Sequence, residues 1–309
     1  MLPLLDPRRG QYSERAIAAC GLSGLQHLLP PISPDAVASA ALLPSAAHDM
    51  GLSSNTTVST GPYDLPAAAL GAGLTARGDG LLIIGTTLAS LVKVDQVGTD
   101  GSTVGLTLRA ADDRGYLRAM PAMVGTAALD WVAELLKVEH SDLGSLLSRS
   151  ATGASGVRVL PYFSPSGERA PFSEPRARAE IVGLDLTATP ADVVRAVCES
   201  LAFAARQCLE AAGWAGAITV AGGGSRTREF LTILATVLDK PVTVAVADST
   251  AVGALLAADP QCSDRGASMD VPSVIEPDVS EGSVYQDLYI EYCQRVAAAR
   301  LRWKEDERV

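Results

Sequence analysis

The sequence predicts an α/β fold with parallel strands in its second half, and two observations carry this prediction. The first is a strand at 217–220, a glycine run at 222–224, a helix at 227–238 and a strand at 242–246. A crossover of this kind joins parallel strands through a right-handed connection. The second is a long helix that ends at Gly213 and buries one face. Its apolar stripe, at helical spacing, consists of Val193, Val197, Leu201, Ala204, Cys208 and Ala212.

The start of that long helix is marked by its own capping residues. Thr189 can cap it, Pro190 fits its first turn, and Asp192 follows three residues after the cap. The other predicted elements are, in order, loop and short helix at 1–30, a strand at 56–60, a helix at 66–70, a hairpin of strands 81–84 and 88–94, a helix at 125–138, a strand at 157–160, and helices at 250–258 and 283–303.

Length, charge and cysteine content limit the class of protein. At 309 residues the chain is long enough for about two domains. Its formal net charge of -10 disfavours nucleic acid and anionic membranes as partners. Its five cysteines form no CxxC pair, so we expect reduced thiols and a cytoplasmic protein. No apolar run reaches the length of about 18 residues that a membrane span needs.

Two short motifs could bind phosphate groups. The glycines 222–224 lie between a strand and a helix, where bare amides can hold a phosphate, although a tight turn explains them equally well. Gly85, Thr86 and Thr87 at the hairpin tip offer two hydroxyls and an amide to an anion. Taken alone, this second motif is more simply an ordinary hairpin turn.

Asp64 stands before Pro66 and a helix of small residues, so it could serve as an N-cap or as a general base. The pair Glu168 and Arg169 is better explained as an ion pair that braces a loop than as catalytic groups. The three histidines show no metal-ligand spacing and are expected on the surface. The cluster at 112–114 is expected to be a solvated turn.

Six segments, taken in order, resemble the FGGY family of carbohydrate kinases, in particular xylulose and polyol kinases. They are "GPYDLPAAALGAG", "GDGLLIIGTTLASLV", "AMVGTAALDWVAELL", "LPYFSPSGERAPF", "AEIVGLDLTATPADVVRAVCES" and "VAGGGSRTREFLTILATVL". The resemblance extends over nearly the whole chain. One departure lies in the fifth segment, where Cys198 replaces the usual aliphatic or aromatic residue.

The resemblance implies an α/β protein with the actin/hexokinase-like (ribonuclease H-like) ATPase fold. It implies an ATP-dependent kinase that transfers the γ-phosphate to a hydroxyl of a pentulose such as xylulose, or of a small polyol, with Mg²⁺ bound through phosphate oxygens. Asp64 would be the catalytic base, and Asp64 and Tyr63 would contact the substrate. No side chain is expected to be a dedicated metal ligand. The residues implied in nucleotide binding are Gly85, Thr86, Thr87, Gly125, Gly223, Gly224 and Thr227.

The resemblance also implies an unusual domain organisation. Residues 1–76 resemble the end of the family's N-terminal lobe, and residues 77–309 resemble the nucleotide-binding C-terminal lobe. The beginning of the N-terminal lobe, with its first phosphate loop, has no counterpart in the sequence. We therefore expect an oligomer, or a partner chain that supplies the missing part. A fragment, a misplaced start, a split gene and a degenerate product all stay open, and the alternative function is a non-catalytic nucleotide-binding remnant or regulatory protein.

Overall fold

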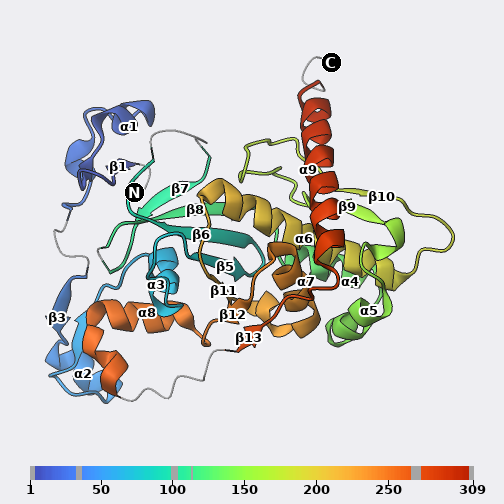
Figure 1. The fold of residues 1–309 in the computed structure, drawn as a ribbon. Helices are drawn as coiled ribbons and strands as arrows, with labels where there is room; N and C mark the ends of the chain where they lie inside the picture. Colours follow the sequence, from blue (N-terminus) through green and yellow to red (C-terminus); the bar gives the residue numbers. More distant parts are fainter. Residues whose placement is uncertain (1–3, 33–36, 99–103, 113, 266–272, 306–309) are drawn as a thin grey trace.

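A mixed β-sheet forms the centre of the computed structural model, which describes residues 4–32, 37–98, 104–112, 114–265 and 273–305 (Figure 1). β11 is parallel to β5 and to β12, which confirms the parallel crossover predicted from the sequence. The remaining neighbours are antiparallel. In spatial order the strands are β13 (Val274–Ile275), β12 (Val242–Val244), β11 (Ile218–Ala221), β5 (Gly80–Ile84), β6 (Leu88–Val94), β8 (Tyr116–Ala122) and β7 (Leu106–Arg109).

Helices cover both faces of this sheet because alternate side chains of each central strand point to opposite sides. In β5, Leu82 and Ile84 belong to the larger hydrophobic core, to which α6 (Pro190–Ala212) contributes most of its buried face. Leu81 belongs to a second core on the other face, together with Ala68 and Ala69 of α3 (Asp64–Gly71). The sheet therefore separates two groups of helices.

The remaining elements lie around these two layers. The helices are α1 (Glu14–Ala19), α2 (Pro44–Met50), α4 (Ala127–Leu136), α5 (Leu143–Arg149), α7 (Arg228–Leu238), α8 (Ser249–Ala258) and α9 (Gly282–Glu305). Three short antiparallel pairs are β1 (Leu5–Asp6) with β2 (Gln11–Tyr12), β3 (Ser39–Ala41) with β4 (Thr57–Ser59), and β9 (Arg158–Leu160) with β10 (Glu180–Val182).

The predicted limits of α6 are confirmed in atomic detail. The Thr189 hydroxyl accepts the N–H of Asp192, and the Asp192 carboxylate accepts the N–H of Thr189, which is a complete capping box. Hydrogen bonds from Thr189 and Ser150 hold the pKa of Asp192 well below its usual range. Gly213 ends the helix with φ 89°, a conformation that glycine adopts without the steric cost of a Cβ.

The structure contains elements that the sequence pattern missed and corrects one prediction. β7, β8 and α5 were not predicted; β8 carries Arg118 and Pro121, which obscure its alternation. The cluster at 112–114 forms a turn, as predicted, with Arg114 exposed, whereas Asp112 is partly buried rather than solvated and Asp113 lies outside the described residues. The buried amine of Lys93 donates to both carboxylate oxygens of Asp112, at 2.8 and 2.9 Å. A buried ammonium needs such a counter-charge, and only the fold brings the two residues together.

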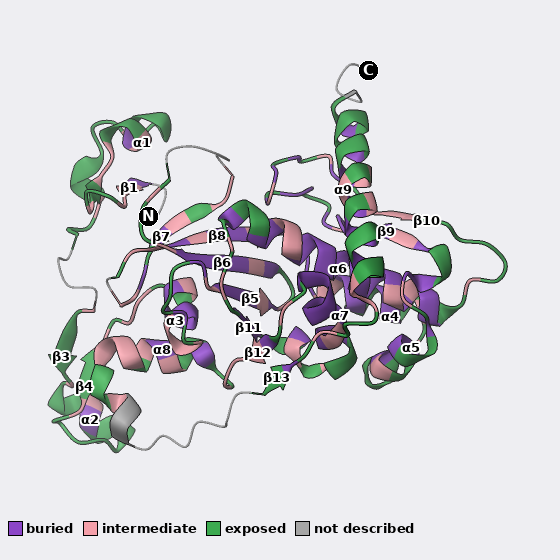
Figure 2. Ribbon diagram, viewed as in Figure 1, coloured by how far each residue is buried: buried purple, intermediate pink, exposed green. Residues whose placement is uncertain are grey.

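The residues before α3 bury little of their apolar surface. Leu28, Leu43 and Met50 are 68%, 69% and 65% exposed, and this part of the ribbon is mostly coloured as exposed in Figure 2. β4 confirms the predicted strand at 56–60, but its partner is only β3, in a sheet of two strands. Figure 1 shows these elements beside the main sheet rather than within it.

α3 itself is packed closely against α8. A Cβ added to Gly71 would lie 1.8 Å from the Ser249 carbonyl oxygen, and one added to Gly253 would lie 1.8 Å from the Ala67 carbonyl oxygen. The two helix backbones can approach this closely only because glycine occupies both contact points. This contact attaches the segment that carries Asp64 to the later half of the chain.

Candidate active site

The hairpin tip and the start of α4 form the first part of the site. The predicted hairpin is confirmed, with Gly85, Thr86 and Thr87 between β5 and β6. The Gly125 N–H donates to the Thr86 carbonyl at 2.9 Å, and the Thr126 N–H donates to the Gly85 carbonyl at 2.7 Å. A Cβ on Gly125 would lie 2.4 Å from the Gly85 oxygen, so the contact requires glycine. The exposed hydroxyls of Thr86 and Thr87 therefore stand beside a helix N-terminus.

The glycine run after β11 lies next to Ile84, the last residue of β5 before the hairpin tip. A Cβ on Gly222 would lie 2.7 Å from the Ile84 carbonyl oxygen, and one on Gly224 would lie 2.4 Å from Ile84 Cγ2. A Cβ on Gly223 would meet no atom within 4 Å, so this residue faces open space. Parallel β5 and β11 end at the same edge of the sheet, which is where ligands bind in open α/β sheets.

A cavity of about 230 Å³ opens beside the glycine run. Its inner wall is apolar, with leucines from α4 and α5 and Phe230 from α7, and such walls suit a flat ring. At its edge His140 Nε2 lies 3.2 Å from Asp130 Oδ1. The full lining is Thr126, Leu129, Asp130, His140, Leu143, Leu147, Cys198, Gly223, Gly224, Thr227 and Phe230.

The structure places the residues predicted to bind nucleotide in one region, although Gly85, Thr86, Thr87 and Gly125 do not themselves line the cavity. Gly223, Gly224 and Thr227 line the cavity, and Gly125 joins them to the hairpin tip through its neighbour Thr126. The glycine run is the tight turn considered from the sequence and a cavity wall as well. His140 is exposed, as predicted, but its place at the cavity edge had no signal in the sequence. The contribution of α5 was also missed, because α5 itself was not predicted.

Asp64 and Tyr63 lie at the start of α3, outside the cavity. Tyr63 is the N-cap of α3, and Asp64 is the first helical residue, so the N-cap interpretation of Asp64 is wrong. Its Oδ1 accepts only the adjacent Leu65 N–H, at 2.8 Å, among the hydrogen bonds described for it. Asp64 and Tyr63 are exposed, and α3 covers the face of the sheet opposite the cavity. The structure therefore leaves a solvated carboxylate at a helix start, outside the cavity.

No cluster of three or more histidine, cysteine, aspartate or glutamate side chains suited to a metal occurs within the described ranges. The five cysteines are free thiols, as expected from their spacing. In the part of the chain that the structure describes, no helix is long and apolar enough to cross a membrane.

Glu168 and Arg169 support the loop between β9 and β10. The buried Glu168 Oε1 accepts the N–H groups of Met123, Arg169 and Ala170 at 2.9, 2.8 and 3.3 Å. Arg169 Nε donates to the Pro121 carbonyl of β8 at 2.9 Å. Both side chains thus brace the loop against β8, through backbone groups. Burial raises the pKa of Glu168, and the three N–H groups partly offset that rise.

This bracing role predicts a large difference between two substitutions. Glu168→Ala should lower the free energy of unfolding by about 2–3 kcal/mol, because three backbone N–H groups lose their acceptor. Glu168→Gln keeps an acceptor oxygen, so near pH 4 its free energy of unfolding should stay close to that of the native protein. Urea unfolding measures both variants.

The raised pKa of Glu168 adds a pH dependence to that comparison. A carboxyl group whose pKa is higher in the folded than in the unfolded protein stabilises the fold at pH values below the unfolded pKa. This contribution to the stability of the protein is lost as the pH rises through the folded pKa. Glu168→Gln should therefore gain stability relative to the native protein between pH 4 and neutrality. A difference that is constant over that range would contradict the buried, desolvated state of Glu168.

A mixed sheet with helices on both faces and a cavity beside the glycine run defines an α/β protein. Residues 80–259 match the C-terminal domain of the FGGY family of carbohydrate kinases. The chain therefore belongs to this family, and the expected family is confirmed.

Individual relatives agree with this assignment. Erythritol kinase of Brucella abortus is 27% identical over 96% of this chain and 62% of its own length. The structure of xylulose kinase from Rhodospirillum rubrum is 27% identical, with a TM-score of 0.78, and is matched over 97% of this chain and 63% of its own. That of xylulose kinase from Lactobacillus acidophilus, 21% identical, has a TM-score of 0.83 over 98% and 63% of the two chains.

These comparisons confirm the actin/hexokinase-like α/β fold expected from the sequence. The chain spans about 62–63% of the length of these three proteins.

Proposed function

We propose that this chain carries the nucleotide-binding part of an ATP-dependent kinase that phosphorylates a hydroxyl of a sugar or polyol. The observation that supports this most directly is a set of contacts around one cavity. Thr126 and the glycine run line the cavity, and the hairpin tip is hydrogen-bonded to Gly125 and Thr126. The relatives named erythritol kinase and xylulose kinase suggest a small polyol or a pentulose as the acceptor.

In this proposal each part of the site has one role. The apolar cavity takes the adenosine, with the Gly223 backbone lying flat against it. Gly85, Thr86 and Thr87 bind the β- and γ-phosphates through hydroxyls and amides, and Gly125 brings the positive end of α4 towards the same phosphates. These groups stabilise the charge that spreads over the phosphoryl oxygens during transfer.

The residues around the hairpin tip fit Mg²⁺ bound as part of a nucleotide complex. They offer hydroxyls rather than a carboxylate cluster, and Mg²⁺ commonly keeps water ligands and binds through substrate phosphates. Mg²⁺ held in this way would neutralise phosphate charge, while Thr86 and Thr87 orient the phosphoryl group.

Asp64 is proposed as the general base and, with Tyr63, as a contact for the sugar. An exposed carboxylate that accepts one local N–H retains lone pairs for a substrate hydroxyl. α3 lies on the other face of the sheet from the cavity. A general base at Asp64 therefore requires a sugar or polyol that reaches both Asp64 and the phosphates bound at the hairpin tip. The same observation favours a second candidate function, nucleotide binding without transfer.

We also propose a division near residue 76, between α3 and β5, with 1–76 belonging to an N-terminal lobe and 77–309 to a nucleotide-binding lobe. The exposed apolar side chains before α3 support a further polypeptide, from an oligomer or a partner chain, that covers them. The free thiols support a cytoplasmic location.

Calorimetric titration with ADP and with ATP, each with and without Mg²⁺, tests the nucleotide site in the chain as it stands. Thr86→Val keeps the shape of the side chain but removes a hydroxyl beside the phosphates. It should weaken ATP binding by about 3- to 10-fold and leave adenosine binding unchanged, as one hydrogen bond is worth about 0.5–1.5 kcal/mol. Equal losses for ATP and adenosine would contradict the assignment of the hairpin tip to the phosphates.

A further inference from the structure

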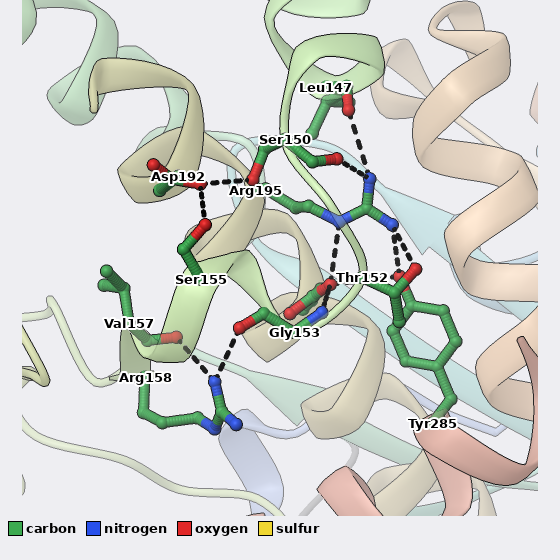
Figure 3. A network of polar contacts seen from close by, with 11 residues as sticks. Leu147, Ser150, Thr152, Gly153, Ser155, Val157, Arg158, Asp192, Arg195 and Tyr285 are labelled. Atoms are coloured by element: carbon green, nitrogen blue, oxygen red, sulfur yellow. Dashed lines mark hydrogen bonds and ion pairs between the residues drawn. The ribbon is translucent and has the colours of Figure 1, made fainter. Parts of the chain in front are cut away.

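A partly buried arginine lies next to the wall of the cavity. Arg195, on α6, has a side chain only 13% exposed, and Glu199, one turn later, has one only 4% exposed. Figure 3 shows the Arg195 guanidinium surrounded by groups from the 147–153 segment and from α9. Neither residue lines the cavity, and neither has a role in the proposed phosphoryl transfer.

All five N–H donors of this guanidinium have an acceptor. Nε donates to Glu199 at 2.9 Å, and Nη1 donates to the carbonyls of Leu147 and Ser150 at 3.1 and 2.8 Å. Nη2 donates to Thr152 Oγ1 and to Tyr285 Oη, both at 2.9 Å. Arginine has five donors in a planar fork, whereas lysine has three, so lysine cannot reproduce this set.

Glu199 completes the cluster from the other side. Its Oε1 accepts the Gly153 N–H and the Tyr285 hydroxyl, each at 3.0 Å. The hydroxyl of Tyr285, on α9, therefore accepts from Arg195 and donates to Glu199. Three separate parts of the chain, namely α6, the 147–153 segment and α9, meet at one ion pair, in which Glu199 is buried and Arg195 is partly buried.

The acceptors of Arg195 have a direct relation to the cavity. The Leu147 carbonyl belongs to the last turn of α5, where carbonyls lack a partner within the helix. The same α5 presents the side chains of Leu143 and Leu147 to the cavity. On α6, Cys198 lies in the cavity wall immediately before Glu199. The cluster thus links two walls of one cavity.

We infer that Arg195, Glu199 and Tyr285 are positioning residues for nucleotide binding, which fix α5 against α6 so that the cavity keeps its width. This inference rests on the proposed nucleotide site. It adds that α9, which does not line the cavity, controls nucleotide affinity through a single hydroxyl.

α6 carries a second cluster with the same three residue types, although its glutamate is more exposed, and this cluster provides the control variants. Arg206 Nε donates to Glu210 at 2.8 Å, Nη1 donates to the Val237 carbonyl at 3.0 Å, and the Tyr289 hydroxyl donates to Glu210 at 2.6 Å. It also joins α6 to α9. Val237, however, lies at the end of α7 farthest from Thr227 and Phe230, so this cluster does not hold the cavity wall.

The experiment compares ADP affinity in the full chain, measured by calorimetry well below the melting temperature of each variant. Tyr285→Phe removes one hydroxyl and keeps the ring, and we expect about 3- to 10-fold weaker ADP binding, the loss of about one hydrogen bond. Arg195→Lys should weaken ADP binding by about 10-fold or more, because at least two acceptors on the wall segment lose their donor. Tyr289→Phe and Arg206→Lys should bind ADP within about 2-fold of the native chain, because their cluster lies away from the cavity wall.

Two results would overturn the inference. The first is an ADP affinity in Tyr285→Phe equal to that of the native chain, which would overturn the inference even if Arg195→Lys failed to fold. The second is an equal loss of ADP affinity in Tyr285→Phe and Tyr289→Phe, which would show that both clusters act only on the stability of the fold. If the native chain itself binds no ADP, the proposed nucleotide site is wrong and the inference falls with it, which is distinguishable from binding that the substitutions leave unchanged.

Discussion

Asp64→Asn is expected to reduce the rate of phosphoryl transfer by about 10²–10⁴-fold, the range typical of the loss of a general base. The asparagine oxygen can still accept the Leu65 N–H that Asp64 Oδ1 accepts, at 2.8 Å, so α3 should keep its start. Only the ability to take a proton from the acceptor hydroxyl is lost. ADP affinity should be unchanged, since Asp64 lies outside the cavity.

The rate is measured in a hybrid that joins this chain to the part of the erythritol kinase it does not span. Glu14→Gln serves as the control, because Glu14 is also an exposed acid in the first turn of a helix. It should leave the rate unchanged. Turnover close to the native value in Asp64→Asn would rule out Asp64 as the base and favour a chain that binds nucleotide without transferring phosphate.

Gly223→Val is expected to weaken ADP binding by about 10- to 100-fold without loss of stability. An added Cβ meets no protein atom within 4 Å, so the fold has room for the side chain. That room is the space assigned to adenosine, and forcing extra methyl groups into a packed contact costs about 1–3 kcal/mol. Calorimetric titration with ADP gives the affinity, and thermal unfolding gives the stability.

Gly224→Val, one residue later, should behave in the opposite way. Its Cβ would lie 2.4 Å from Ile84 Cγ2, so the change should lower the free energy of unfolding by about 1–3 kcal/mol, as overpacking does. If Gly223→Val bound ADP normally, the cavity would not be the adenosine site. If the two variants lost the same free energy of unfolding, Gly223 would not face open space.

The family and the α/β fold could be predicted from the sequence because their signals are local. The capping box at Thr189, the terminating Gly213 and the crossover through the glycines 222–224 depend on residues close together in the chain. Backbone preferences and hydrophobic periodicity act over such short distances, and the structure confirms these elements. The order of the motifs then pointed to the FGGY carbohydrate kinases.

The family resemblance grouped the residues assigned to nucleotide binding, and only the tertiary structure decided which of their atoms are in contact. The contact between Gly125 and Gly85 joins positions forty apart in number, and no local pattern encodes it. Lys93 with Asp112, and Arg195 with Tyr285, are pairs of the same kind. Each charge would be well solvated in an unfolded chain. Only burial by the folded sheet and helices makes its partner necessary, so the sequence determined the elements and the packing determined the pairs.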